Sequence, residues 1–171
     1  MSWHLRKMKM NELIQKIEQW ATDRNIIKGS KPIDQAMKLF SEFGELADNV
    51  GKGRDCRDDI GDVFVVLTII AAQLDCSTEE NFNVSLWHEK EDLSIKDYVL
   101  LLSDKLTEFC FDARDGNVDN NVFDAAVSIL KTIAFKLNTT LEECAQIAYN
   151  DIKDRKGRME NGVFIKEGDV A

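Results

Sequence analysis

The sequence predicts an all-α protein, and three observations support this prediction. Its 171 residues match the length of about one domain and allow a sizeable hydrophobic core. One proline and nine glycines favour long uninterrupted helices over a turn-rich β protein. Apolar residues recur at helical spacing along most of the chain, beginning with Met10, Leu13, Ile14, Ile17 and Trp20. We therefore expect one domain over residues 1–171, built as a helical bundle.

The first two expected helices are separated by a short basic loop. The spacing that begins at Met10 predicts a first helix over residues 9–23. A loop with glycine follows at residues 28–30. Pro32 stands where the first turn of a helix tolerates proline, and an apolar stripe then continues to about Val50. The second helix is therefore expected from Pro32 to about Val50.

The third expected helix differs from the others because it is apolar on nearly every side. It follows the linker GKGRD, and Asp55 with Asp58 resembles an N-terminal cap. The apolar pattern covers residues 60–74. A helix without a polar face has to be surrounded by other elements, so we expect it at the centre of the bundle.

The second half of the chain shows further helix starts. Capping-box patterns occur at Ser77-x-x-Glu80 and Thr140-x-x-Glu143, with a weaker one at Ser94 and Asp97. The expected helices cover residues 78–87, 94–113, 121–136 and 140–156. Residues 158–171 form a polar C-terminal arm, in which Asn161-Gly162 could turn a short hairpin.

An internal repeat is suggested by a shift of 63 residues, which aligns residues 38–80 with residues 101–143 and gives nine identities in 43 positions. Because 63 residues are nine heptads, any two amphipathic helix pairs would also match in pattern at this shift. We expect a duplication in which residues 101–143 are a degenerate copy of a helical hairpin at residues 38–80.

Charge and composition exclude several functional classes. The chain has 22 Lys and Arg against 31 Asp and Glu, a formal charge of −9, so binding to nucleic acid or to an anionic membrane surface is not expected. The longest apolar stretch, residues 63–72, is half the length of a membrane-spanning helix. The N-terminus lacks the pattern of a secretory signal, which favours a cytoplasmic protein. No CxxC pair occurs, so buried free thiols are expected at Cys56, Cys76, Cys110 and Cys144.

Two acidic pairs mark the most promising site. Glu42 and Glu45 lie three residues apart on the second helix, and Asp59 and Asp62 repeat this spacing on the third. The rows that carry them continue into apolar residues, so the four carboxylates should converge near one wall of the bundle. Clustered carboxylates need a compensating cation, and Mg²⁺ is the natural one, with Mn²⁺ as a substitute. The alternative is four surface acids that pair with Lys38, Arg54 and Arg57.

A basic cluster ends the last expected helix. Lys153, Arg155, Lys156 and Arg158 fall within six residues of an otherwise acidic chain. Basic residues near a helix C-terminus complement the helix dipole, which accounts for one or two of them. Four together also suit the binding of a triphosphate.

Other metal and nucleotide sites are disfavoured by what the sequence lacks. His4 and His88 are the only histidines, and neither has the spacing of a di-iron bundle or of a zinc site. No P-loop motif occurs. Trp3, Trp20 and Trp87 could stack on a base, but an aromatic residue at helical spacing, such as Trp20, is more often part of the core.

Four segments carry the acidic pairs, the basic cluster and the end of the chain: KLFSEFGEL at 38–46, DDIGDVFVV at 58–66, AYNDIKDRKG at 148–157 and NGVF at 161–164. Together they resemble the MazG-like nucleotide pyrophosphohydrolases of the all-α nucleoside triphosphate pyrophosphohydrolase superfamily. The hallmark of the family is ExxE on one helix and ExxD on the next. Glu42, Glu45 and Asp62 match it, whereas Asp59 replaces the usual Glu, and Ser41 stands where many members carry a further Glu.

This resemblance implies a helical bundle of the superfamily's type and the hydrolysis of a nucleoside triphosphate to monophosphate and pyrophosphate, in the housecleaning of nucleotide pools. Water would be the nucleophile, and Mg²⁺ would be held by Glu42, Glu45, Asp59 and Asp62. Lys38, Lys153 and Arg155 would contact the phosphates, and Lys156 and Arg158 belong to the same basic segment.

The resemblance also gives the expected repeat a meaning. In the aligned second copy, Glu42 faces Lys105, Asp59 faces Val122 and Asp62 faces Ala125, and only Glu45 is matched, by Glu108. One chain would then imitate a family dimer with one competent site. Further association into a homodimer through another face is compatible with this arrangement.

A second functional interpretation stays open. The chain could be a non-catalytic helical module that binds nucleotides or a partner protein, and the departures at Ser41 and Asp59 favour it. No sequence feature identifies the base or the sugar.

Overall fold

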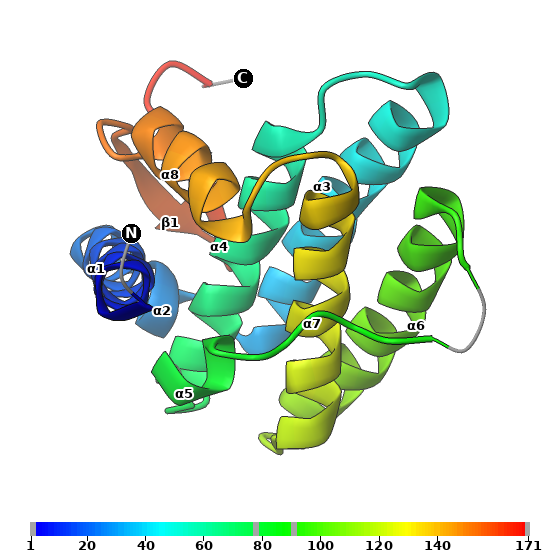
Figure 1. Ribbon diagram of the computed structural model, residues 1–171. Helices are drawn as coiled ribbons and strands as arrows, with labels where there is room; N and C mark the ends of the chain where they lie inside the picture. Colours follow the sequence, from blue (N-terminus) through cyan, green and yellow to red (C-terminus); the bar gives the residue numbers. More distant parts are fainter. Residues whose placement is uncertain (1–2, 77–78, 90–91, 170–171) are drawn as a thin grey trace.

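The computed structural model describes residues 3–76, 79–89 and 92–169. This part of the chain forms eight helices and one two-stranded sheet, which confirms the predicted all-α class (Figure 1). The helices are α1 Trp3–Asp23, α2 Ile26–Gly29, α3 Pro32–Lys52, α4 Arg57–Gln73, α5 Glu79–Phe82, α6 Ile95–Arg114, α7 Asn120–Lys136 and α8 Leu141–Ile152. The strands are β1 Gly157–Glu160 and β2 Val163–Lys166.

Helix α4 lies at the centre of the molecule, as its composition predicts. It packs against α1, α2, α3, α7 and α8, and Figure 1 shows it between the α1–α8 side and the α6–α7 side. From Asp59 to Ala71 every residue except Asp62 is buried. Gly61 allows the closest approach, because a Cβ atom at this position would collide with the backbone carbonyl of Cys144 on α8. The α4–α8 contact therefore depends on a residue without a side chain.

Helices α6 and α7 pack against each other as a hairpin, and α6 also packs against α3. The apolar residues of this hairpin include six that are fully buried: Leu102, Leu106, Phe109, Val127, Leu130 and Ile133. The hairpin packs against α3 through α6 and against α4 through α7. A twofold relation between the two hairpins stays a prediction.

One expected helix is wrong for most of its length. The helix expected over residues 78–87 is reduced to the single turn α5, and the chain from 83 to 89 has no regular secondary structure. Polar side chains of α7 hold this segment by its backbone. Thr132 Oγ1 accepts a hydrogen bond from the Trp87 N–H at 2.8 Å, and Ser128 Oγ donates to the Ser85 carbonyl at 2.6 Å. Lys131 Nζ donates to the Val84 carbonyl at 2.7 Å. These bonds replace those that a helix would have made internally.

Two helix boundaries also differ from the prediction. The short helix α2 occupies part of the region expected to be a loop at 28–30. Helix α8 ends at Ile152, four residues before the expected end. Arg24, the residue after α1, donates hydrogen bonds to the carbonyls of Lys153 and Arg155, so these carbonyls are satisfied outside a helix. The chain is thereby free to turn into the strands.

The C-terminal segment contains the hairpin suggested by Asn161-Gly162. Strands β1 and β2 pair antiparallel, with Glu160 opposite Val163, and both turn residues have positive φ angles of 50° and 79°. The hairpin packs against α1 through an edge contact between Phe164 and Trp20, whose ring centroids are 6.0 Å apart. It is therefore part of the folded body and not a free arm.

Two of the expected caps are found. Ser94 and Asp97 form a complete capping box at α6, and Thr140 accepts the Glu143 N–H at α8. The cap expected from Asp55 with Asp58 is wrong, because Cys56 precedes α4 without a side-chain cap, and Asp55 accepts only the Arg57 N–H. The pattern at Ser77 lies outside the described residues.

The thiols are free, as expected, with Cys56, Cys110 and Cys144 buried and Cys76 half-buried. None of the described helices combines the length and apolar composition needed to cross a membrane.

Candidate functional site

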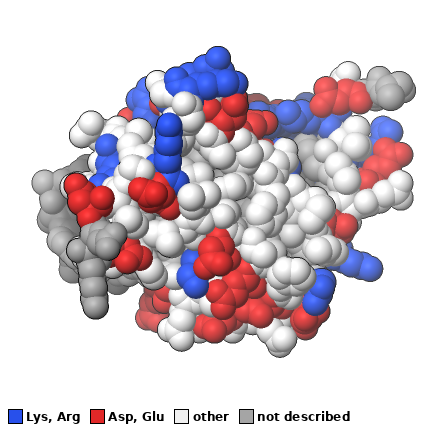
Figure 2. Space-filling model, turned by 90° about the vertical axis from the view of Figure 1, so that its right-hand side faces the viewer, with Lys and Arg blue, Asp and Glu red and all other residues white. Residues whose placement is uncertain are grey.

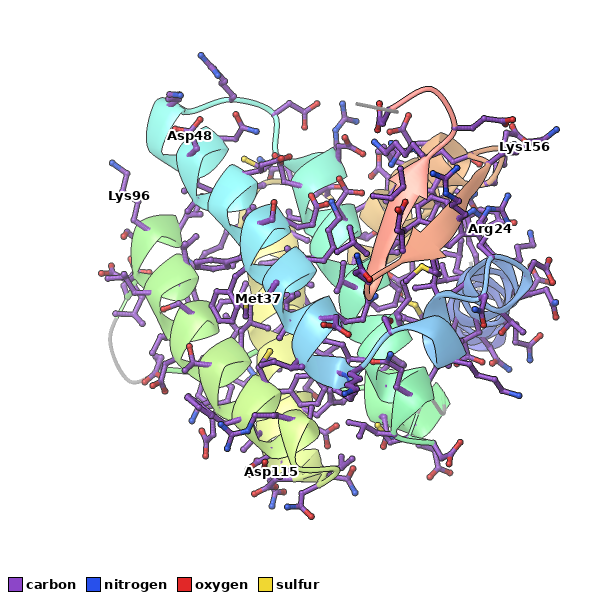
Figure 3. The ribbon with its side chains drawn as sticks, turned by 180° about the vertical axis from the view of Figure 1, so that it is seen from behind. Arg24, Met37, Asp48, Lys96, Asp115 and Lys156 are labelled. Atoms are coloured by element: carbon purple, nitrogen blue, oxygen red, sulfur yellow. The ribbon has the colours of Figure 1, made fainter. Side chains whose placement is uncertain are left out.

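A cavity of about 340 Å³ lies where α3 and α4 meet α1, α8 and the hairpin. Figure 3 shows the two strands between the beginning of α3 and α1, so the hairpin forms one wall of this region. Its lining combines charged, polar and apolar side chains. It contains the acids Asp34, Glu42 and Asp62, the bases Lys38, Arg155 and Lys166, the polar Gln35 and the apolar residues Ile26, Val65, Val66, Ile69, Ile152 and Phe164, together with Trp20.

Two of the predicted acids face this cavity from neighbouring helices. Glu42 of α3 is buried and forms an ion pair with Lys38, one turn earlier on the same helix. Asp62 of α4 has its pKa raised to about 7, first by burial and then by the charges of Glu42 and Asp58. Lys38 and Arg155 oppose this effect. Positive and negative groups therefore act on Asp62 from α3, α4 and the chain beyond α8.

The other acid of the second pair lies just beside the cavity. Asp59 is only 7% exposed, and its Oδ2 accepts a hydrogen bond from Asn49 Nδ2 at 2.9 Å. Burial raises its pKa, the Asn49 bond lowers it, and the charge of Glu42 raises it again. Asp59 is thus electrostatically coupled to Glu42, although it does not line the cavity.

Asp58 is an acid that the motif does not include. Burial and the charge of Asp151 raise its pKa, followed by that of Asp59, while Arg155 lowers it. Arg155 in turn pairs with Asp151 at 3.0 Å. Asp151 lies far from Asp58 in the sequence and on a different helix. Helical periodicity therefore gave no indication that Asp58 and Asp151 come together.

Glu45 is not brought to the same place. It is exposed on α3 and does not line the cavity. Within the described residues, no three acidic, histidine or cysteine side chains are arranged closely enough to hold a metal ion. The convergence of all four predicted carboxylates is therefore not formed in this structure, and the metal roles of Glu45 and Asp59 stay predictions.

The alternative of surface ion pairs describes these acids only in part. Lys38 does pair with Glu42. Arg57, however, pairs with Asp55 at 2.7 Å and with Glu143 at 3.5 Å, so it serves the start of α4 and α8.

Only some of the predicted basic residues line the cavity, as is true of the predicted acids. Lys38 and Arg155 line the cavity, whereas Lys153, Lys156 and Arg158 do not. Figure 3 shows Lys156 at the outer edge of the molecule, and Arg158 pairs with Glu160 at 3.3 Å. Lys166 of β2 lines the cavity and was missed, because the hairpin's position against α3 depends on tertiary packing.

The face of the molecule on which α6 lies has a different character. Figure 2 shows uncharged surface across its middle and a group of acidic side chains along its lower edge, with Lys and Arg scattered around them. Leu100 and Phe111 of α6 are 69% and 57% exposed. Neither residue lines the cavity between α3 and α4.

Comparison with known proteins adds one partial likeness. No family model and no solved structure matches the chain. A relative from Haemophilus phage HP1, described as an uncharacterized 18.2 kDa protein in the rep-hol intergenic region, is 48% identical over 66 residues. The match covers 37% of this chain and 40% of the phage protein, so the chain spans about two fifths of the relative's length.

Proposed function

We propose that the protein is a Mg²⁺-dependent nucleoside triphosphate pyrophosphohydrolase of the MazG-like kind. One observation carries the proposal: a single cavity is lined by the carboxylates of Glu42 and Asp62, by the cations of Lys38, Arg155 and Lys166, and by apolar side chains. Such a lining suits a ligand with a polyphosphate at one end and a planar organic group at the other. The resemblance of the α3, α4 and α8 motifs to the family supports the same assignment.

The chain's own cations have a clear task in this proposal. Lys38 and Lys166 would act as point charges on phosphate oxygens, and Arg155 would offer a two-pronged donor. We call Glu42 and Asp62 the acidic wall of the cavity. The positive charge of the three cations offsets the repulsion between the acidic wall and a triphosphate. Pairing with Asp151 fixes Arg155 before the ligand arrives. The substrate's position is thus determined by residues from α3, α8's C-terminal continuation and β2.

The donor chemistry of the acidic wall fits Mg²⁺. This ion prefers carboxylate oxygens and is commonly bound through one or two of them, with water and substrate phosphates in its other positions. Glu42 and Asp62 would hold it, and Asp58, Asp59 and Glu45 are the acids closest in sequence to this pair. When bound, the ion would neutralise charge on the phosphates.

The proposed reaction is a hydrolysis. Water adds to a phosphorus of the α–β anhydride, the bridging P–O bond breaks, and the products are nucleoside monophosphate and pyrophosphate. The water's proton would pass to a carboxylate near the site that does not itself hold the ion.

Incubation with ribo- and deoxynucleoside triphosphates tests the proposal. Monophosphate and pyrophosphate should accumulate with Mg²⁺ and not with EDTA. Glu42→Gln should lose this activity, whereas Asp104→Asn, a change on the exposed side of α6, should retain it. Release of single phosphates, or no turnover of any nucleotide, would refute the proposal.

The non-catalytic binding module is the rival outcome of the same experiment. The exposed position of Glu45 and the presence of Asp in place of Glu at position 59 favour it. Calorimetry would then show a bound nucleotide that stays intact for hours.

A further inference from the structure

We propose that Gln35 reads the nucleobase of the substrate, through a carboxamide oxygen that accepts a hydrogen bond from an N–H on the outer edge of the base. This inference rests on the proposed function, because it assigns the end of the same cavity that lies away from the acidic wall. It concerns specificity and gives Gln35 no part in the chemistry of hydrolysis.

The position of Gln35 fits a base at this end. Gln35 and Glu42 both line the cavity and lie seven residues apart on α3, which corresponds to about 10 Å along the helix axis. On α4, which packs against α3, Asp62 and Ile69 span the same interval. This length is close to that of one nucleoside. A phosphate near Glu42 and Asp62 would therefore place the base near Gln35, Ile26 and Ile69.

The orientation of the Gln35 carboxamide is fixed by Ser30. The single hydroxyl hydrogen of Ser30 is donated to the Ile26 carbonyl at 2.6 Å. The Ser30 oxygen can then only accept, and it does so from Gln35 Nε2 at 2.9 Å. Because the amide nitrogen has to face Ser30, the amide oxygen has to face the other way.

A second amide confirms the direction of this network. Gln73 Nε2 also donates to Ser30 Oγ, at 3.2 Å, and to the carbonyls of Ile27 and Ser30 at 3.1 and 3.0 Å. Carbonyls only accept, so the Gln73 amide cannot be reversed. Ser30 therefore stays an acceptor toward both glutamines.

The amide oxygen of Gln35 remains available to a ligand. Gln35 is 6% exposed overall, and no described residue donates a hydrogen bond to its Oε1. This oxygen is not among the buried unpaired atoms of the described residues, so it is not sealed from solvent, and Gln35 lines the cavity. A pre-oriented acceptor in a cavity that also has apolar walls favours a ring that carries an N–H at its edge, which is how protein pockets read unpaired bases.

The purely structural interpretation makes a different prediction. Gln35 could serve only to tie α3 to α2 through Ser30, as Gln73 ties α4 to the same residue. Removal of either amide would then weaken folding and leave base preference unchanged. Gln73 does not line the cavity, so it is the matched control.

The test measures binding, so that it does not depend on turnover. The full-length protein is titrated by calorimetry, with Mg²⁺, against the α,β-methylene analogues of dATP, dCTP, dGTP and dTTP. The best of these is then compared with a derivative in which methyl groups replace the N–H hydrogens of the base edge. We expect the wild type to bind the unmethylated form about 10-fold more tightly, the effect of one hydrogen bond that leaves its partner unpaired when lost.

Gln35→Leu should reduce this ratio to within twofold of 1, and Gln73→Leu should keep it. If Gln35→Leu fails to fold, Gln35→Met, which preserves the length of the side chain, gives the same comparison. An unchanged ratio in the Gln35 variant, or an equal loss in the Gln73 variant, would overturn the inference while pyrophosphate release could still support the proposed function. Absence of nucleotide binding would overturn both.

Discussion

Replacement of Asp62 by Asn should stabilise the apo protein at alkaline pH and have little effect at acidic pH. Burial, Glu42 and Asp58 raise the pKa of Asp62 from 3.8 to about 7, so the folded chain holds this proton more tightly than the unfolded chain. The stability that this proton provides is complete below pH 4 and is lost as pH rises to about 7. Asn keeps the shape without acquiring the charge.

The size of the effect follows from the same pKa. A rise from 3.8 to about 7 would correspond to about 4 kcal/mol for a fully enclosed carboxyl. Because Asp62 is partly exposed in an open cavity, solvent screening reduces the expected gain of the Asn variant to about 1–2 kcal/mol at pH 8. Since the other titrating groups are common to both proteins, they largely cancel in the difference.

Urea unfolding followed by circular dichroism at pH 4.5, 6 and 8, with EDTA present, measures this difference. Asp97→Asn is a control of opposite sign, because hydrogen bonds from Ser94 lower the pKa of Asp97 and its charge therefore supports folding at neutral pH. An Asp62→Asn variant that is destabilised equally at all three pH values would refute the reasoning about the acidic wall.

Three further predictions concern packing and the acids. Gly61→Ala should destabilise the protein by about 2–3 kcal/mol in urea, because its Cβ would meet the Cys144 backbone, and an unchanged midpoint would contradict the close α4–α8 contact. If Glu45 has the metal role that the family resemblance implies, Glu45→Ala should abolish pyrophosphate release while its exposed position keeps the melting temperature within a few degrees; normal turnover would remove Glu45 from the metal site. Glu108→Gln should leave turnover intact, since Glu108 pairs with Lys105 in the second hairpin, and a loss of activity there would argue against a single competent site.

The sequence was sufficient to predict an element where the local apolar pattern agrees with the burial seen in the structure. The central position of α4 could be predicted because its apolar residues leave no polar face, and the C-terminal hairpin because Asn161-Gly162 favours positive φ angles. The irregular segment at 83–89 could not be predicted, because the side chains that bind its backbone, Ser128 and Thr132, lie more than 40 residues away.

The candidate site was predicted in part for the same reason. Helical spacing placed Glu42 and Asp62 on neighbouring helices, but it could not show that Glu45 is exposed and does not line the cavity. Gln35 and Lys166 enter the cavity only because Ser30 and the hairpin pack beside α3. Their contribution depends on tertiary contacts that no local pattern encodes.

The most direct measurement of the central claim is a ³¹P NMR time course of a nucleoside triphosphate with the wild-type protein and with Glu42→Gln. With Mg²⁺, the wild type should replace the three triphosphate signals by those of monophosphate and pyrophosphate, and Glu42→Gln should leave them unchanged. Nucleoside diphosphate with inorganic phosphate, or a triphosphate that persists with the wild type, would contradict the account.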